Sequence, residues 1–244
     1  MIFLYVILGL LCAISGVAIL HVLFLFIITA FVKVKDYESQ SRFYRSVFIY
    51  YLKLILFFSR VKVITSGMEQ LSGIDGDFLL VGNHRSDFDP IITLVALKNK
   101  DFAFISKPEN FKIPIVRKFL YKGLHVPIDR ENARNALKTV NLTAARIKGG
   151  VMSYGVYPEG TRSKGKNLLP FHDGVFKIAQ KAEAPIVVAG VTGTETVHKR
   201  APWRRTVVHF DILDVLDVEK VKALSSHELA SLAHEKLLSA TEGK

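Results

Sequence analysis

The chain begins with a long stretch that carries no charge. Between Met1 and Val32 there is no Asp, Glu, Lys or Arg, and a helix needs only about 20 apolar residues to cross the hydrocarbon core of a bilayer. A cleavable signal peptide is the alternative, but it has a basic start and an apolar core of only about 7 to 15 residues. We therefore predict a membrane anchor helix over residues 1–32.

Basic residues follow this stretch directly. Lys33, Lys35, Arg42 and Arg45 outnumber the only acidic neighbours, Asp36 and Glu38. Because positive charge flanking a membrane helix stays in the cytoplasm, the rest of the chain is expected on the cytoplasmic face. An arrangement in which the N-terminal helices enter one leaflet without crossing it remains open.

A second apolar stretch covers residues 43–58 and carries two cations, Arg45 and Lys53. Their spacing of eight places them on roughly one side of a helix. Tyrosines and cations suit the headgroup zone, so residues 33–62 are interpreted as a linker and an interfacial helix. The alternative is a core helix of the following domain, since an all-round apolar helix also suits a protein interior.

Residues 63–244 alternate between two patterns. Runs rich in β-branched and aromatic residues at 78–82, 102–106, 124–128, 151–157, 186–191 and 206–212 predict strands. Between them, apolar residues recur at helical spacing, as in Ala133, Ala136, Leu137, Val140 and Ile147. The alternation predicts one α/β domain with a central mixed sheet flanked by helices. Ser225 and Glu228 form a capping-box pattern ahead of a final amphipathic helix.

Charge and cysteine usage narrow the class of partner. The net charge of +11 favours an anionic partner: a nucleic acid, a membrane face or a phosphorylated substrate. No recognised nucleic-acid-binding motif is present, which argues against the first. Cys12 is the single cysteine, so neither an intramolecular disulfide nor a thiol metal site is possible. The oligomeric state cannot be inferred from this pattern.

His84 follows an apolar strand and stands where sites in α/β sheets commonly open. Asp89, five residues later, would lie about 140° away from it on a continuous helix, so only a turn can bring the pair together. Pro90 favours a helix over residues 90–97 with Asp89 as its N-cap. The sequence therefore predicts that His84 and Asp89 meet across a strand-to-helix turn.

A histidine held by a carboxylate is suited to general-base catalysis, because the carboxylate fixes the tautomer and stabilises the imidazolium. Ser86 is a weak candidate nucleophile, since no serine or cysteine stands in a nucleophile-elbow pattern. Direct attack by a substrate hydroxyl is therefore expected. Two alternatives remain: a loop histidine beside a helix cap, and a divalent metal bound by His84, Asp87 and Asp89. We expect no metal, because no further ligand is spaced nearby.

Two motifs in order strengthen this interpretation. Residues 83–90 (NHRSDFDP) and 157–163 (YPEGTRS) resemble the glycerophospholipid acyltransferase family, which includes 1-acyl-glycerol-3-phosphate acyltransferases. Residues 123–130 (GLHVPIDR) are similar to that family's second block, and residues 184–190 (APIVVAG) to its fourth. The resemblance covers about residues 78–191 and leaves the N-terminal helices and the C-terminal tail without a motif.

The resemblance implies transfer of a fatty acyl group from acyl-CoA or acyl carrier protein to the sn-2 hydroxyl of lysophosphatidic acid, without a cofactor. His84 and Asp89 would be catalytic. Arg130 and Arg162 would bind phosphate, a use to which the planar guanidinium is suited. Glu159 would contact the acceptor, and Gly160 and Thr161 would complete the phosphate site.

The chain departs from the family pattern at two places. His172 stands where many members have a basic residue after the Phe, and it is assigned no catalytic role. Val188 and Ala189 replace a second proline of the fourth block. Other acceptors, including glycerol 3-phosphate or another lysolipid, would use the same site. A non-enzymatic alternative is a membrane-tethered protein that binds anionic ligands.

Overall fold

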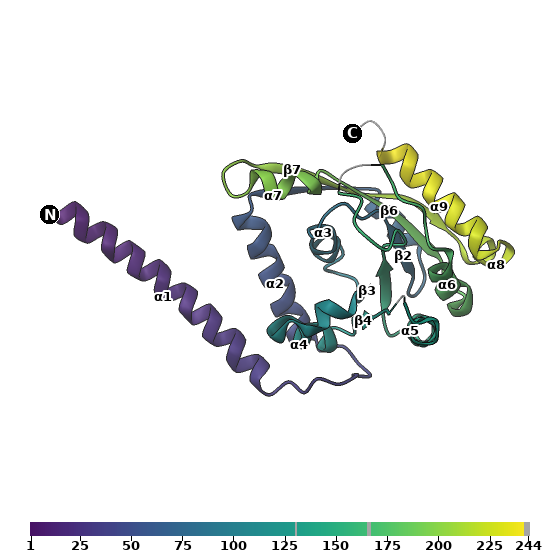
Figure 1. Cartoon of the computed structure of the whole chain (residues 1–244), viewed down its shortest axis with the longest axis horizontal. Coiled ribbons are helices and arrows are strands. Elements are labelled where there is room, and N and C mark those ends of the chain that lie inside the picture. The colour runs from purple at the N-terminus through teal and green to yellow at the C-terminus, as the bar shows by residue number, and fades with distance from the viewer. Residues whose placement is uncertain (130, 165–166, 242–244) are drawn as a thin grey trace.

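A seven-stranded mixed sheet forms the centre of the protein in a computed structural model, which describes residues 1–129, 131–164 and 167–241. The strands run in the order β1-β7-β6-β2-β5-β3-β4, and the β6–β7 pair alone is antiparallel. Their bounds are β1 Val61–Ser66, β2 Leu79–Gly82, β3 Phe102–Ser106, β4 Val126–Pro127, β5 Ser153–Val156, β6 Ile186–Thr192 and β7 Thr206–Leu216. The predicted α/β class and mixed sheet are confirmed (Figure 1).

Each of the six predicted strands overlaps an observed one, although β6 and β7 run past their predicted ends and β4 keeps only two residues of its predicted run. The central strands were recognisable because strands covered on both faces form continuous apolar runs. β1 was not predicted. It lies at the edge of the sheet, pairs with β7 alone and leaves most of its residues exposed, so it lacks that signal.

Helices cover both faces of the sheet (Figure 1). On one face lie α5 Ala133–Lys148, α6 Lys177–Ala182, α8 Val218–Ala223 and α9 Ser226–Thr241; on the other lie α2 Arg42–Phe58 and α3 Asp89–Ala96, with α4 Pro114–Lys122 beside them. The remaining short elements are α7 Val197–Arg200 and the 3-10 turns η1 Met68–Gly73, η2 Pro108–Lys112, η3 Asp173–Phe176 and η4 Thr194–Thr196.

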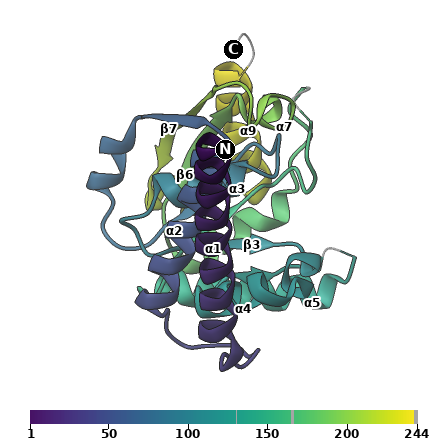
Figure 2. The same cartoon turned by 90° about the vertical axis from the view of Figure 1, so that its left-hand side faces the viewer.

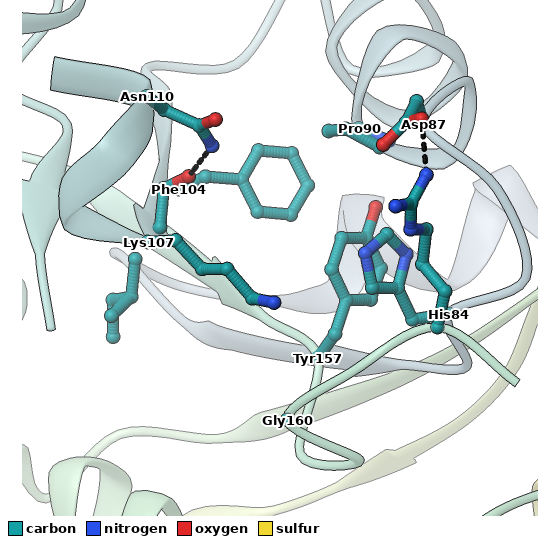
Figure 3. Close-up of a pocket in the computed structure, with 11 residues that line it drawn as sticks. His84, Asp87, Pro90, Phe104, Lys107, Asn110, Tyr157 and Gly160 are labelled. Atoms are coloured by element: carbon teal, nitrogen blue, oxygen red, sulfur yellow. Dashed lines mark hydrogen bonds and ion pairs between the residues drawn. The ribbon is translucent and has the colours of Figure 1, made fainter. Parts of the chain in front are cut away.

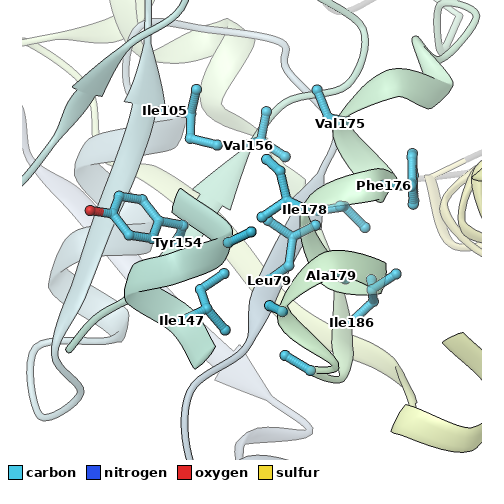
Figure 4. Close-up of a cluster of buried hydrophobic side chains, with 14 of the residues drawn as sticks. Leu79, Ile105, Ile147, Tyr154, Val156, Val175, Phe176, Ile178, Ala179 and Ile186 are labelled. Atoms are coloured by element: carbon cyan, nitrogen blue, oxygen red, sulfur yellow. The ribbon is translucent and has the colours of Figure 1, made fainter. Parts of the chain in front are cut away.

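Successive side chains along β2 point to opposite faces of the sheet and so belong to two different hydrophobic cores. Leu79 and Val81 belong to the core under α5, α6 and α9, whereas Phe78 and Leu80 belong to the core under α2 and α3. In the first core, Tyr154 and Ile186 are fully buried together with Ile178 of α6, as Figure 4 shows. The sheet is therefore packed from both sides, which leaves its strand ends as the place for a site.

The buried face of α5 differs from the predicted one. Val140 and Ile147 are buried as expected, but Leu137 is 52% exposed. Thr139 and Thr143 are buried instead, and their hydroxyls donate to the carbonyls of Pro127 and Thr139. A buried threonine is tolerated when its hydroxyl is hydrogen-bonded, and an apolar-residue pattern overlooks such a face.

The predicted capping box at the start of α9 is confirmed. The amide of Glu228 donates to Ser225 Oγ at 3.2 Å, and the amide of Ser225 donates to Glu228 Oε2 at 2.8 Å. Leu229, Ala233 and Leu237 then point into the core. The helix is thereby fixed at its start and along one side.

The N-terminal helix α1 Ile2–Ala30 projects from the side of the domain that carries α2 and α4 (Figures 1 and 2). Its last turns are held by the domain, because Tyr44 Oη donates to the Ile28 carbonyl and Lys118 Nζ to the Thr29 carbonyl. Among the described residues it is the one helix long and apolar enough to span a bilayer. This helix supports association with a membrane.

Helix α2 combines features of both interpretations of its sequence. Ile49, Leu52 and Leu56 are buried against the domain, whereas Phe57 and Phe58 at its end are more than two-thirds exposed. Arg45 was expected to meet lipid headgroups and does not: its guanidinium donates to carbonyls at the end of α3, those of Leu97, Lys98 and Lys100. An interfacial position of α2 stays a prediction.

His125, just before β4, gives the fold a dependence on pH. The imidazole is buried, Nδ1 accepts from the Phe104 amide, and burial lowers the pKa of His125 to about 3 from 6.5. As pH falls below 6.5, the unfolded chain binds a proton that the folded chain does not. The free energy of unfolding should therefore fall by about 1.4 kcal/mol per pH unit from this residue.

Unfolding of the detergent-solubilised protein by denaturant, repeated at several pH values between 7 and 4, measures that slope. His125→Asn keeps an acceptor for the Phe104 amide but cannot titrate, so the slope should become shallower by this amount. His227→Asn removes an exposed histidine and should leave the slope unchanged. Equal slopes in all three proteins would refute the assignment.

Candidate active site

His84 and Asp89 meet at the turn between β2 and α3. His84 Nδ1 lies 2.8 Å from Asp89 Oδ2, in the geometry that the spacing and Pro90 predicted. The Asp89 carboxylate is completely buried, whereas the His84 side chain is 16% exposed. A buried carboxylate on Nδ1 places the ring proton there and leaves Nε2 with a lone pair.

The carboxylate of Asp89 does not cap α3. The helix begins at Asp89 itself, and the side chain points back into the preceding turn. There Oδ2 accepts from the amides of Arg85 and Ser86 at 2.6 and 2.7 Å, in addition to His84. The N-cap prediction was wrong because three donors of the turn compete for the carboxylate, and together they fold the turn around it.

The other carboxylate oxygen is held by the turn that follows β6, a strand neighbouring β2. Thr194, just after β6, is fully buried, and its hydroxyl donates to Asp89 Oδ1 at 2.5 Å. Asn83 ties the same two strand ends together, since its side chain donates to the Val191 carbonyl and accepts from the Val191 amide. Two strand ends therefore fix the position of the carboxylate.

The imidazole of His84 is fixed from a second direction. It stacks on Tyr157 with ring centroids 4.4 Å apart and planes 8° apart, and Tyr157 in turn stacks on Phe104. The His84 carbonyl accepts from the Ser163 amide at 2.8 Å. The ring thus keeps one orientation, because the backbone of His84 and one face of its imidazole are both held.

Glu159 lies inside the loop. Its side chain is buried, Oε1 accepts from the His84 amide at 2.5 Å, and Oε2 accepts from the Leu169 amide at 3.1 Å. Burial raises the pKa of Glu159, and the two amide donors oppose that rise. The side chain contacts the backbone of His84 and is not part of the pocket lining, which gives Glu159 a positioning role. The expected contact with an acceptor stays a prediction.

His84 opens onto a pocket of about 220 Å³ at the strand ends, shown in Figure 3. Arg162 and Asp87 form an ion pair on one side of it. Lys107 reaches in from the end of β3, with its amine directed toward His84 and Tyr157. Two cations and a histidine therefore surround one cavity, an arrangement that suits an anionic ligand with an ionisable hydroxyl.

The other predicted site residues lie in different places. Gly160 lines the pocket and has φ of +76°, a conformation that glycine adopts without strain. Thr161 is exposed and is not part of the pocket lining. Arg130 lies outside the described residues. His172 is exposed at the start of η3 and is not part of the pocket lining.

The metal and nucleophile alternatives do not fit this geometry. Asp87 pairs with Arg162, and both oxygens of Asp89 accept from protein donors. Within the described part of the chain, no group of three His, Cys, Asp or Glu side chains could hold a metal ion. Ser86 is buried, and its hydroxyl accepts from the Phe88 amide.

Sequence reasoning missed several residues of this site. Lys107 and Asn110 follow the predicted strand 102–106, and the ends of parallel strands meet at one edge of a sheet. That rule could have found both residues. Tyr157 ends the predicted strand 151–157 and Thr194 follows the predicted strand 186–191, so the same rule places both at this edge. Their contacts with His84 and Asp89 depend on which strands become neighbours of β2.

Fold and site together define an α/β protein with a histidine–carboxylate pair at its strand ends. The fold is shared with a crystal structure titled as the 1-acyl-sn-glycerophosphate acyltransferase PlsC from Thermotoga maritima. The TM-score is 0.63 at 24% identity, and the match covers 91% of this chain and 88% of that one. A model of the family described as Acyltransferase matches residues 62–192. The chain belongs to this acyltransferase family.

Curated relatives agree with the family. A 1-acyl-sn-glycerol-3-phosphate acyltransferase of Haemophilus influenzae is 28% identical over 157 residues, 64% of this chain and 65% of that protein. A chloroplastic protein of the same name from Brassica napus is 31% identical over 183 residues, 75% of this chain and 52% of its own length. The match thus spans less than two thirds of each relative.

Proposed function

We propose that this protein transfers a fatty acyl group from an acyl thioester, acyl-CoA or acyl carrier protein, to the sn-2 hydroxyl of lysophosphatidic acid, giving phosphatidic acid. The observation that carries the proposal is the contact of 2.8 Å between His84 Nδ1 and Asp89 Oδ2, beside a pocket lined by Arg162 and Lys107. The names of the curated relatives supply the acceptor.

In this mechanism Nε2 of His84 accepts the proton of the acceptor hydroxyl while its oxygen attacks the thioester carbonyl. Asp89 stabilises the imidazolium that forms. Collapse of the tetrahedral intermediate breaks the carbon–sulfur bond, and the imidazolium returns its proton to the departing thiolate. Because the thioester is already activated, the proposed reaction needs no cofactor.

The catalytic domain is proposed to act at the cytoplasmic face of a membrane. Three cations follow α1 and favour a cytoplasmic position of the domain by the positive-inside rule: Lys33, Lys35 and Arg42. Arg45 does not contribute, because it donates to backbone carbonyls. Both the lipid acceptor and the acyl product would then remain at the interface.

The test is an assay of purified protein with labelled acyl-CoA or acyl carrier protein against lysophosphatidic acid, glycerol 3-phosphate and a neutral lysolipid. Lysophosphatidic acid should be acylated with the highest kcat/KM of the three acceptors. Preference for another acceptor would show that the proposed acceptor is wrong, while the proposed acyl transfer by His84 would stand. Binding of anionic lipid without turnover would instead support the non-enzymatic alternative.

Arg162 and Lys107 should bind the acceptor phosphate. We expect Arg162→Ala or Lys107→Ala to raise the KM for lysophosphatidic acid about 10- to 100-fold, because a hydrogen bond to a charged group contributes about 1.5–3 kcal/mol. Arg162→Lys should raise this KM less than Arg162→Ala does, but still above the wild-type value, since lysine lacks the planar fork of the guanidinium. Steady-state kinetics with a fixed donor measures this, and Lys181→Ala on α6 is the control. Changes confined to donor kinetics would contradict phosphate binding.

Thr194 should act through Asp89. Thr194→Val keeps the shape of the side chain but removes the donor to Asp89 Oδ1. We expect kcat to fall about tenfold or more, given about 1.5–3 kcal/mol for such a bond, with little change in KM. Thr194→Ser retains the hydroxyl and should recover most of the rate. If Thr194→Ser loses the rate and Thr194→Val keeps it, the methyl packing of Thr194 matters and its hydroxyl does not.

A further inference from the structure

Three large aromatic side chains stand in solvent on the side of the domain from which α1 projects. Trp203 is 84% exposed, and Phe57 and Phe58 at the end of α2 are 72% and 67% exposed. None of them contributes to the two hydrophobic cores. Figures 1 and 2 place both α2 and the α7–β7 connection, which contains Trp203, on that side.

The end of α2 and the α7–β7 connection form one continuous surface. The strands that follow them, β1 and β7, pair in parallel from Val61 and Thr206, and the Thr206 amide donates to the Arg60 carbonyl at 3.1 Å. Phe57, Arg60, Val61 and Arg205 line a single cavity there. We call the surface formed by Phe57, Phe58, Arg60, Trp203, Arg204 and Arg205 the Trp203 surface.

The positive charge of this surface is not balanced by acidic residues. Residues 57–68 and 197–210 contain no Asp or Glu, while Lys62, Lys199 and Arg200 add to its three arginines. None of these cations forms an ion pair within the described residues. Exposed aromatic rings among unpaired cations are complementary to an anionic, partly apolar partner.

We propose that the Trp203 surface docks onto the headgroup region of an anionic lipid leaflet, as a second membrane contact besides α1. Tryptophan favours the interface, where the ring is partly buried and its N–H stays hydrated, and each nearby cation is attracted to an anionic leaflet. A nucleic acid would match the charge, but the shared side with the apolar α1 favours lipid.

Docking at this surface also positions the catalytic turn. The ring of His198 in α7 meets that of Phe88 edge-on, with centroids 5.2 Å apart, and Phe88 immediately precedes Asp89. The segment that carries Trp203 is therefore packed against the turn that carries the histidine–aspartate pair. A fixed depth of Trp203 at the interface sets the height of the pocket above the lipid.

Trp203 can serve as an intrinsic fluorescence probe, because it is the only tryptophan in the sequence. The full chain is reconstituted into phosphatidylcholine vesicles with or without phosphatidylglycerol, and tryptophan emission is recorded. With phosphatidylglycerol, Trp203 emission should lie at shorter wavelength than in detergent. It should be quenched by phosphatidylcholine brominated along its acyl chains and no longer quenched by aqueous acrylamide.

A matched control moves the probe to the opposite side of the domain. Trp203→Phe combined with Ala223→Trp places the indole on α8, at an exposed position, where it should stay open to acrylamide and unquenched by bromine. Arg204→Gln with Arg205→Gln should remove the dependence of Trp203 emission on phosphatidylglycerol. Trp203 emission and acrylamide quenching that match those in detergent would overturn the inference, as would equal bromine quenching at both probe positions.

Discussion

Replacing His84 with alanine should lower kcat/KM for acyl transfer by about 10²- to 10⁴-fold, the contribution typical of a positioned general base. His84 is the one pocket residue whose free ring nitrogen can accept the hydroxyl proton while Asp89 holds the other nitrogen. The loss should appear in kcat rather than in the KM for the acceptor, because the cations of the pocket remain. Steady-state kinetics with lysophosphatidic acid and labelled acyl-CoA measures both constants.

His172→Ala is the matched control, since this second histidine of the site loops is exposed and does not line the pocket. It should keep nearly full activity. Membrane insertion and the thermal midpoint of unfolding should also survive His84→Ala, because the side chain is partly exposed and the Asp89 carboxylate keeps its other donors. Undiminished turnover by His84→Ala would rule out the base assignment.

The contact between His84 and Asp89 was predictable because local rules determine it. Pro90 marks the start of a helix, and the apolar run before Gly82 marks the end of a strand, so the five-residue spacing had to form a turn. The donors around Asp89 could not be predicted from such local rules. Arg85 and Ser86 supply backbone amides that no residue pattern reveals, and Thr194 lies in the turn after β6, more than 100 residues away along the chain.

Glu159 shows the same limit. Its motif indicated importance, but nothing in the motif indicated that its carboxylate accepts from the amide of His84. That bond joins residues on two loops after β2 and β5, which are neighbours in the sheet. A sequence displays the residue type, whereas the partner depends on strand order. The edge strand β1 was missed for a related reason, since a mostly exposed strand lacks the apolar run of buried ones.

Asp89 should prove essential through its charge, and two substitutions can separate charge from structure. Asp89→Asn can keep an oxygen toward His84, Arg85 and Ser86, while its amide donates to the Thr194 hydroxyl, which can rotate to accept. The turn should therefore stay folded. A neutral amide cannot stabilise the imidazolium, so kcat should fall about 10²- to 10⁴-fold, within the range of general acid–base catalysis.

Asp89→Ala should lose activity and stability together. It leaves the amides of Arg85 and Ser86 without their acceptor in a buried turn, and each such loss costs about 1–3 kcal/mol. Kinetics and denaturant unfolding of both variants test this separation. Wild-type kcat in Asp89→Asn would show that the carboxylate only orients His84. A stability loss in Asp89→Asn as large as that in Asp89→Ala would instead show that the charge holds the turn, and the kinetic defect could then be structural.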